Sequence, residues 1–179
     1  KVYVFRGGTA SMTAWDSVDQ YPYANEAGDT FGWSLAAGDW DADGHDDIAA
    51  SCPLEVTGGV KSGYVMVYRG GSSGMTWWHG LGQSTLDTDE EFDYFGHALA
   101  AGDFNGDGKM DLAVGAPGEG VGVDAQSGKI YIYRGTTSAL TAWTSFAQGN
   151  LGTDEQGDLY GWALAAGDFS GDGKADLAV

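Results

Sequence analysis

Three short segments of the chain carry oxygen-bearing side chains at alternating positions. Counted from the first Asp, positions 1, 3, 5 and 9 of each segment hold Asp, Asn or Ser. Calcium takes about six to eight oxygen ligands, and alternate side chains of a tight loop can point toward one ion. The spacing therefore predicts three Ca²⁺ sites, with side-chain ligands Asp39, Asp41, Asp43 and Asp47; Asp103, Asn105, Asp107 and Asp111; and Asp168, Ser170, Asp172 and Asp176.

The positions between these ligands agree with the prediction. Position 6 is glycine in every copy, where the chain must turn sharply. At position 7 we expect the main-chain carbonyl to complete each ligand set, in His45, Lys109 and Lys174. The loops are not EF-hands, because the Glu expected at position 12 is replaced by Ala50, Val114 and Val179, which are typical strand residues.

An alternative interpretation of each loop needs no metal. A segment rich in Asp and Gly is often an ordinary turn in which Asp side chains accept hydrogen bonds from nearby backbone N–H groups. Three copies with oxygen at the same positions favour calcium, because carboxylates packed together without a counter-charge repel one another.

Composition excludes several other classes of partner and site. The formal net charge is -18, which would repel phosphate backbones and anionic lipid surfaces, so we expect no nucleic-acid partner. The chain contains no stretch approaching the roughly 20 apolar residues that a membrane span needs, so we expect no membrane insertion. Cys52 is the single cysteine, which rules out an intramolecular disulfide and a Cys-based zinc site, and we expect it to be buried.

The elements that must position the loops recur with a period of 64 to 65 residues. Residues 95–114 and 160–179 are identical at 16 of 20 positions, and residues 31–50 follow the same pattern. Each period is typical of four short strands, A to D, separated by turn-rich segments. Strand A is predicted at 31–38, 95–102 and 160–167; strand B at 47–50, 111–114 and 176–179; strand C at 1–6, 64–69 and 129–134; strand D carries Trp15, Trp78 and Trp143.

The side chains of these strands favour an all-β fold, a β-propeller of four-stranded blades. Strand A ends in Leu-Ala-Ala-Gly in each copy, and such small residues suit innermost strands that converge on a central channel. Strand C is apolar on both faces, as expected for a sheet packed between two neighbours. We interpret the recurrent tryptophans as packing between blades rather than as a row that stacks on carbohydrate.

Two further motifs identify a resemblance to a known family. Phe31-Gly32 and Phe95-Gly96 match an FG element, with Tyr160-Gly161 a conservative departure, and Gly115-Ala116-Pro117 matches a GAP element. The chain resembles the FG-GAP repeats of integrin α-chain propellers and their bacterial relatives. The resemblance implies four-stranded blades with calcium in the A-to-B hairpins on one face, and ligands on the opposite face, formed by the B-to-C and D-to-A loops.

The order of strands predicts about three blades' worth of one propeller segment, residues 1–179. We expect a C-D half blade at 1–30, full blades at 31–94 and 95–159, and an A-B half blade at 160–179. Half blades would expose apolar faces and strand edges. We therefore expect either the remaining blades of a longer chain or self-association that completes the ring.

Function is predicted as binding rather than catalysis. We expect an extracellular or cell-surface calcium-binding module for adhesion, with a protein or glycan ligand, since weak calcium sites are filled where calcium is millimolar. The alternatives are a structural scaffold or fibre subunit and, third, a propeller enzyme such as a glycosidase. Against an enzyme, His45 lies in a loop, His79 in a predicted turn and His97 at a repeated position, and no nucleophile motif surrounds a serine. The repeated Asp29, Asp93 and Asp158 are interpreted as structural.

Overall fold

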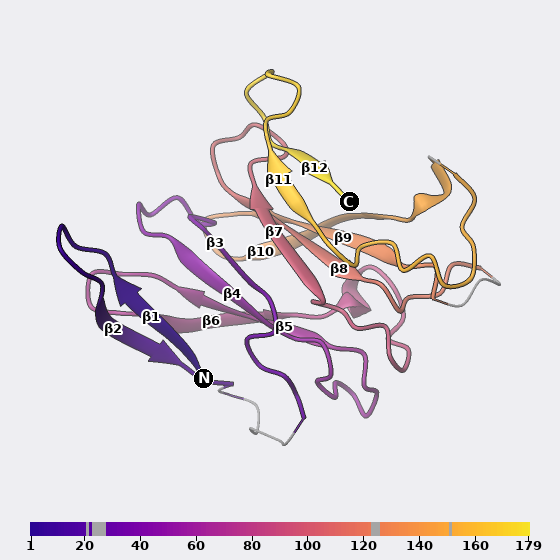
Figure 1. The fold of residues 1–179 in the computed structure, drawn as a ribbon, viewed down its shortest axis with the longest axis horizontal. Helices are drawn as coiled ribbons and strands as arrows, with labels where there is room; N and C mark the ends of the chain where they lie inside the picture. Colours follow the sequence, from indigo (N-terminus) through magenta and orange to yellow (C-terminus); the bar gives the residue numbers. More distant parts are fainter. Residues whose placement is uncertain (21, 23–27, 123–125, 151) are drawn as a thin grey trace.

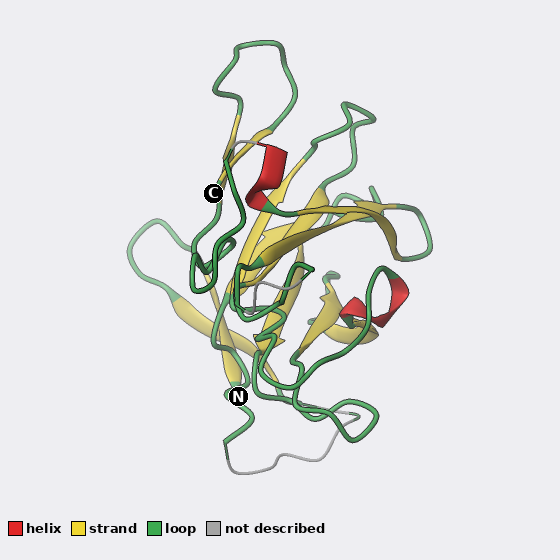
Figure 2. Ribbon diagram, turned by 90° about the vertical axis from the view of Figure 1, so that its right-hand side faces the viewer, coloured by secondary structure: helices red, strands yellow, loops and turns green. Residues whose placement is uncertain are grey.

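The structure is a computed structural model that describes residues 1–179 except 21, 23–27, 123–125 and 151. The described residues form an all-β fold with two single turns of 3-10 helix, η1 (Gln83–Thr85) and η2 (Gln148–Asn150). Figure 2 shows these turns in red among yellow strands and green loops. Within the described residues, no helix has the length and apolar composition that a bilayer span needs.

Four antiparallel sheets follow one another along the chain (Figure 1). In each sheet the strands pair in the order in which they occur in the sequence, so the sheets are simple meanders. The first sheet pairs β1 (Val2–Arg6) with β2 (Thr13–Val18). The second comprises β3 (Leu35–Gly38), β4 (Asp47–Cys52), β5 (Tyr64–Arg69) and β6 (Thr76–Leu81); the third β7 (Ala98–Gly102), β8 (Asp111–Ala116), β9 (Lys129–Gly135) and β10 (Leu140–Phe146); and the fourth β11 (Ala165–Gly167) and β12 (Asp176–Ala178). The second and third sheets have the antiparallel four-stranded form of propeller blades, and the first and fourth have two strands each. The division into blades at residues 31, 95 and 160 stays a prediction.

The first strands of successive sheets lie side by side, β3 against β7 and β7 against β11. Small side chains make this approach possible. A Cβ added at Gly102 would lie 2.6 Å from the Cβ of Ala175, and one added at Gly38 would lie 3.0 Å from Met110. The Leu-Ala-Ala-Gly pattern is therefore explained by crowding where the sheets converge, as the sequence predicts.

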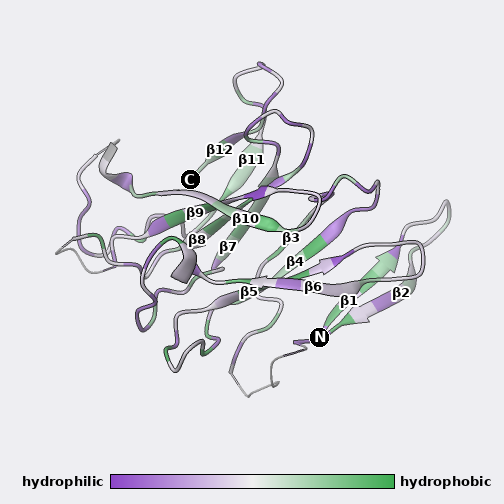
Figure 3. Cartoon of the chain, turned by 180° about the vertical axis from the view of Figure 1, so that it is seen from behind, coloured by the Kyte–Doolittle hydropathy of each residue, from purple (hydrophilic) through white to green (hydrophobic). Residues whose placement is uncertain are grey.

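Three apolar cores fill the spaces between neighbouring sheets. Alternate residues of β5 point into different cores: Met66 and Tyr68 pack with Val2 of the first sheet, while Val65 and Val67 pack with the third sheet. In β9, Tyr131 packs toward the second sheet and Ile130 toward the fourth. Green hydrophobic colour runs along β9, the second of these doubly covered strands, in Figure 3. The prediction that strand C is buried on both faces is confirmed for these two sheets.

Strand A is shorter than predicted, because its first residues form a turn. Gly32, Gly96 and Gly161 have φ values of +83°, +91° and +91°, in the left-handed region that favours glycine. The N–H of residue 33 donates to the carbonyl of Thr30, and that of His97 donates to Tyr94, which closes the turn. The FG element therefore precedes the strand instead of beginning it.

The recurrent tryptophans stack on arginines of their own sheet. The guanidinium of Arg69 lies 4.4 Å from the ring centre of Trp78, and the matching distances are 4.8 Å for Arg6 over Trp15 and 5.6 Å for Arg134 over Trp143. Trp78 also packs against the core between the second and third sheets, but Trp143 is 40% exposed. Packing between sheets is confirmed for Trp78 and stays a prediction for Trp143, and cation–π stacking with the neighbouring strand explains the fixed spacing.

Cys52 is a buried free thiol, as the sequence predicts. It lies in the core between the first two sheets, and burial raises the pKa of its thiol well above the usual range. The residue acts as a small apolar side chain in that core.

Candidate metal centres

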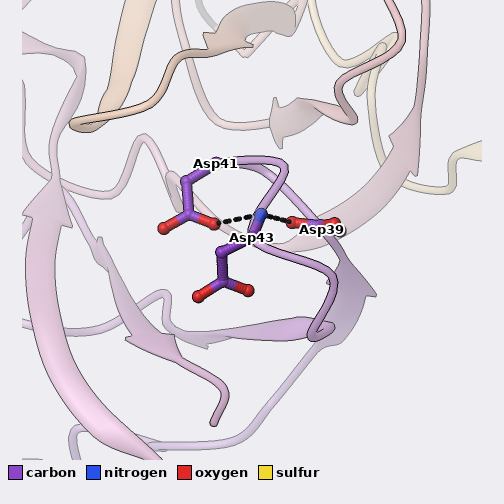
Figure 4. Close-up of side chains that lie close together, drawn as sticks. All are labelled: Asp39, Asp41 and Asp43. Carbon is purple, nitrogen blue, oxygen red and sulfur yellow. Dashed lines mark hydrogen bonds between the residues drawn. The ribbon is translucent and has the colours of Figure 1, made fainter.

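The loop between β3 and β4 brings three acidic side chains together (Figure 4). Carboxylate oxygens of Asp39, Asp41 and Asp43 all lie within 4.8 Å of one another. The N–H of Asp43 donates to Asp39 Oδ1 and Asp41 Oδ1, both at 3.1 Å, and the N–H of Gly44 donates to Asp39 Oδ2 at 3.0 Å. The backbone thus wraps around the first carboxylate and turns positions 1, 3 and 5 toward a common point.

The other two A-to-B loops repeat this backbone geometry. Asp103 accepts hydrogen bonds from the N–H groups of residues 106, 107 and 108, at 2.7 to 3.1 Å. Asp168 accepts the same set from residues 171, 172 and 173, at 2.7 to 3.1 Å. Among the described residues, neither loop holds three acids as close together as the first, because position 3 is Asn105 or Ser170.

Position 7 contributes an N–H group to each loop. The N–H groups of His45, Lys109 and Lys174 donate to Oδ1 of the position 5 aspartate, each at 2.9 Å. This bond fixes the aspartate at position 5 in one orientation in all three copies. The expected role of the three carbonyls as metal ligands stays a prediction.

Position 9 lies behind the loop and is already bonded to backbone. Asp47 and Asp111 are fully buried. Asp47 accepts N–H groups from Trp40 and Gly70 at 3.1 and 2.9 Å, and Asp111 accepts those of Phe104 and Gly135 at 3.1 and 3.0 Å. These carboxylates tie the A-to-B loop to the end of strand C, a role that the sequence did not reveal.

Burial shapes the electrostatics of position 9. It raises the pKa of Asp47 to about 6, with the charges of Asp41 and Asp43 adding to the effect, although the two backbone N–H bonds oppose it. The pKa of Asp111 is raised for the same reasons, with Asp107 and Asp103 as the neighbouring charges. A cation in the loop would oppose this shift, because positive charge favours the ionised carboxylate.

Hydrogen bonds link the loops of successive sheets. The N–H of Met110, at position 8 of the second loop, donates to the carbonyl of Asp39 at 3.2 Å. The N–H of Ala175, at the same position of the third loop, donates to the carbonyl of Asp103 at 2.9 Å. The three loops therefore form a continuous row at one end of the sheets (Figure 1).

These residues fit a calcium ion by their chemistry. The first loop offers three converging carboxylates, all hard oxygen donors of the kind that calcium prefers. One of them already has a partner, since Arg69 Nε lies 2.7 Å from Asp41 Oδ2. The hydrogen bonds within the loops are also those of metal-free Asx turns, so the acidic group itself is the feature that suits a cation.

The opposite end of the sheets holds a second set of repeated polar residues. Gln83 Nε2 donates to Asp93 Oδ2 and to Glu119 Oε2, and Gln20 Nε2 donates to Asp29 and Glu55 in the preceding repeat. These bonds link the segment before strand A to the loop after strand B, which supports the structural interpretation of Asp29 and Asp93. Both glutamines lie outside the residues predicted from the sequence, although Gln20, Gln83 and Gln148 recur at spacings of 63 and 65 residues.

The same end also carries an aromatic pocket of about 310 Å³. His97 lies between two exposed tryptophans, with ring centres 5.4 Å from Trp33 and 4.1 Å from Trp162, and Tyr94 and Leu54 line the pocket beside them. His97 therefore packs among aromatic rings.

The FG-GAP repeat family matches residues 31–68, 95–133 and 160–179, which together make up more than half of the chain. The chain belongs to the FG-GAP repeat family. The FG-GAP chain is 35% identical over 172 residues to phosphatidylinositol-glycan-specific phospholipase D of Rattus norvegicus, covering 88% of this chain and 18% of that protein. It is 34% identical over 157 residues to integrin alpha-5 of Xenopus laevis, covering 83% of this chain and 14% of that protein. The FG-GAP chain thus spans less than a fifth of these two relatives.

A solved structure, the exotype rhamnogalacturonan lyase YesX, aligns with a TM-score of 0.49 and 14% identity, over 80% of this chain and 27% of that chain.

The two motifs that name the FG-GAP family meet in space. Gly96 of the FG element donates its N–H to the carbonyl of Gly115 of the GAP element, at 3.0 Å. A Cβ at Gly115 would lie 2.1 Å from the carbonyl oxygen of Gly161, in the FG element of the next repeat. Glycine is required at position 115 because backbone from a neighbouring sheet occupies the space of a side chain.

Proposed function

We propose that this FG-GAP segment is a calcium-binding β-propeller module that binds a ligand outside the cell and has no catalytic activity of its own. The convergence of Asp39, Asp41 and Asp43 within 4.8 Å is the observation that carries the calcium assignment. The proposed ligand sets are the fifteen residues at positions 1, 3, 5, 7 and 9 of the three loops. When bound, calcium supplies the positive charge that the clustered carboxylates lack.

Backbone hydrogen bonds hold the loops in position and connect each loop to the loop of the next sheet. Backbone N–H groups hold the first aspartate of each loop, and hydrogen bonds from Met110 and Ala175 couple each loop to its neighbour. Ordering one loop therefore favours the next. The proposed role of calcium is to stabilise the propeller framework on one face.

Removing calcium tests this proposal. Extracellular sites of this kind have Kd values of about 10⁻⁴ to 10⁻³ M, and saturation at 100 Kd stabilises by about 2.7 kcal/mol per independent site. We expect a chelator to lower the Tm in differential scanning calorimetry, and titration calorimetry to detect calcium uptake. An unchanged Tm together with no calcium uptake would show that the metal assignment is wrong.

The proposed ligand is a protein or a glycan, bound at the face opposite the calcium loops. The pocket beside Trp33, His97 and Trp162 supports this proposal, because exposed aromatic rings stack on sugars and anchor protein partners. Binding on a glycan array, lost in Trp33→Ala but retained in Trp143→Ala, would support a glycan ligand. The matches to part of an integrin alpha chain and part of a phospholipase D support a binding module that forms one part of larger proteins.

A structural role in assembly is the second candidate. β1 exposes Tyr3 at 66% and Phe5 at 54%, while Phe169, in the loop after β11, is 65% exposed. We propose that further blades or a second copy cover these surfaces. Light scattering tests this directly, since a stable monomer without any additional chain would contradict it.

The surroundings of His79 and His97 support the proposal that the chain has no catalytic activity. His79 accepts a hydrogen bond from Leu140 N–H at 3.1 Å within the fold, and His97 is packed between indole rings. One ring nitrogen of each of these two histidines therefore has a backbone partner, Leu140 N–H for His79 and the Trp162 carbonyl for His97. Turnover of generic glycoside substrates by the purified chain, abolished by mutation of one of these residues, would refute the proposal.

A further inference from the structure

Phe92 occupies a position that is glycine in the other two repeats. Gly28 and Gly157 stand at the equivalent places with φ values of +108° and +87°, and Phe92 has φ +71°. This left-handed region suits glycine and is an outlier for a bulky residue, because a Cβ there crowds the backbone. Tyr94 differs, since the equivalent residues of all three repeats are left-handed without being glycine. The strain at Phe92 therefore belongs to the second repeat alone.

The fold holds Phe92 in this conformation without burying its ring. The N–H of Phe92 donates to the carbonyl of Lys61 at 2.8 Å, and the carbonyl of Asp93 accepts the N–H of Gly118 at 3.0 Å. The side chain of Phe92 is nevertheless 42% exposed, and its ring centre lies 6.1 Å from that of Tyr94. Strained residues persist where their surroundings fix them, and they gather at ligand sites. A strained and exposed aromatic ring therefore indicates contact with a ligand.

Phe92 stands between two hollows that the same two segments help to line. Tyr94 lines the aromatic pocket of about 310 Å³, and residues 89–91, directly before Phe92, line a second hollow of about 460 Å³. The loop after β4 contributes to both, with Pro53 at the aromatic pocket and Lys61 at the second hollow. One ligand that follows these two segments would thus meet both hollows and the ring of Phe92.

The two hollows differ in chemistry. Among the described residues, the aromatic pocket is lined without any lysine, arginine, aspartate or glutamate, whereas the second hollow carries Asp89, Glu90 and Glu91 beside Lys61. Aromatic rings stack on the apolar faces of sugars, and carboxylates accept hydrogen bonds from hydroxyl groups. Volumes of about 300–1,000 Å³ are typical of sites for small ligands. Because the three carboxylates repel anions, the charge favours a neutral sugar.

We propose that the two hollows are neighbouring subsites of one groove for a neutral oligosaccharide, with Phe92 as the ring on which a sugar unit between them stacks. This inference rests on the proposed ligand binding at this face and narrows the ligand to a glycan of several units. One unit packs on Trp33 and Trp162 in the aromatic pocket, and another donates hydroxyl hydrogen bonds to Glu91. Contact with the ligand gives the strained aromatic residue a function that its packing within the fold does not.

Titration calorimetry with sugars of increasing length tests the proposal. The probes are cello-, xylo-, manno- and galacto-oligosaccharides, from single sugars to chains of several units. For the series that binds, we expect the affinity of the wild type to rise by about tenfold or more with length, the effect of one aromatic contact. Phe92→Gly, which restores the residue of the other repeats, should remove this gain and keep the affinity for the single sugar. The matched control is Trp143→Ala, which removes a ring that is 40% exposed elsewhere and should bind as the wild type does.

Thermal unfolding separates a ligand contact from a structural role of the ring. Glycine adopts the left-handed conformation freely, so Phe92→Gly should have a Tm within about 2 °C of the wild type or above it. A larger fall of the Tm would show that the ring of Phe92 stabilises the fold, and it would overturn the proposal.

A second variant tests the other hollow. Glu91 is exposed, so Glu91→Ala should fold normally and weaken binding of the longer chains by about threefold or more, the effect of one hydrogen bond, without changing the affinity for the single sugar. Unchanged binding of the longer chains in Glu91→Ala would show that the second hollow is not a subsite.

The possible failures are distinguishable from failure of the proposed function. If Trp33→Ala abolishes sugar binding while Phe92→Gly keeps the dependence on length, the aromatic pocket stands as a ligand site and the groove is refuted. If none of the sugars binds the wild type, the groove is refuted as a glycan site and a protein is left as the ligand of the aromatic pocket. Calcium uptake is measured without sugar, so neither result bears on the calcium assignment.

Discussion

The loop between β3 and β4 and the loop between β7 and β8 share a backbone but differ in charge. In both, the first aspartate accepts N–H groups from positions 5 and 6, and a buried aspartate at position 9 accepts two more. Position 3 differs: Asp41 forms an ion pair with Arg69, whereas Asn105 Nδ2 donates to Asp111 Oδ2 at 3.2 Å. The position 3 side chain of the first loop is therefore paired with a cation from outside the loop, Arg69. That of the second loop is hydrogen-bonded to a carboxylate of its own loop, Asp111.

The two loops also differ in backbone strain. Ala42 has φ +61°, and the equivalent Gly106 has φ +77°. A left-handed conformation costs a residue with a Cβ about 1 kcal/mol, whereas glycine adopts it freely. One repeated backbone framework therefore tolerates changes of charge and conformation between its copies, as long as the hydrogen bonds to the aspartates at positions 1 and 9 remain.

The largest change in stability is expected from the position 9 aspartate, which both loops share. Asp47→Ala and Asp111→Ala should each destabilise by about 2–4 kcal/mol, because each leaves two backbone N–H groups without their acceptor in a buried place. Urea unfolding in chelator measures the change. Asp176→Ala is the control, because Asp176 is only partly buried and should cost less stability. An equal loss of unfolding free energy in Asp176→Ala would show that burial of the position 9 aspartate is not the cause.

The pH dependence of the calcium-free protein follows from the same carboxylates. Because burial raises the pKa of Asp47 to about 6 in the folded state from 3.8, the folded protein binds more protons than the unfolded one between these values. Stability should therefore fall as pH rises from about 4 to about 6, and Asp47→Asn should flatten that slope. The Tm in chelator across this range is the measurement, and a rise with pH would contradict the assignment.

A smaller effect is expected from the charge that distinguishes the loops. Arg69→Met should destabilise the calcium-free protein by about 1–2 kcal/mol, because Asp41 is left buried without a counter-charge. Arg134→Met removes the same type of cation–π contact without breaking an ion pair, so it should cost about 0.5–1 kcal/mol. Calcium should reduce the difference in stability between Arg69→Met and Arg134→Met. Equal losses of stability in chelator would show that the ion pair of Arg69 with Asp41 does not stabilise the first loop.

The smallest effect concerns strain. Ala42→Gly should stabilise by about 0.5 kcal/mol, since relief of the left-handed strain slightly exceeds the added freedom of the unfolded chain. Gly106→Ala is the reciprocal change and should destabilise by about 1 kcal/mol. Thermal unfolding of both variants checks the pair, and a loss of stability in Ala42→Gly would show that Ala42 is not strained.

Much of the fold follows from the sequence, because its determinants are local and repeated. Strand C alternates apolar residues on both faces, the strand A residues are small, and Asp recurs at alternate positions of one loop, so spacing alone predicts strands, propeller packing and metal loops. The position 1, 3 and 5 aspartates of the first loop do converge, since a tight turn over five residues leaves their side chains few other directions.

Tertiary structure alone decided the contacts between segments that are distant in the chain. Asp47 appeared as a ligand in the sequence, but its bond to Gly70 forms only when strand C lies beside strand B. Gln83, Asp93 and Glu119 meet because the segment before one sheet crosses the loop of the same sheet after its second strand. Spacing within a loop determines which atoms share a turn, whereas burial and pairing across sheets depend on how all the strands pack.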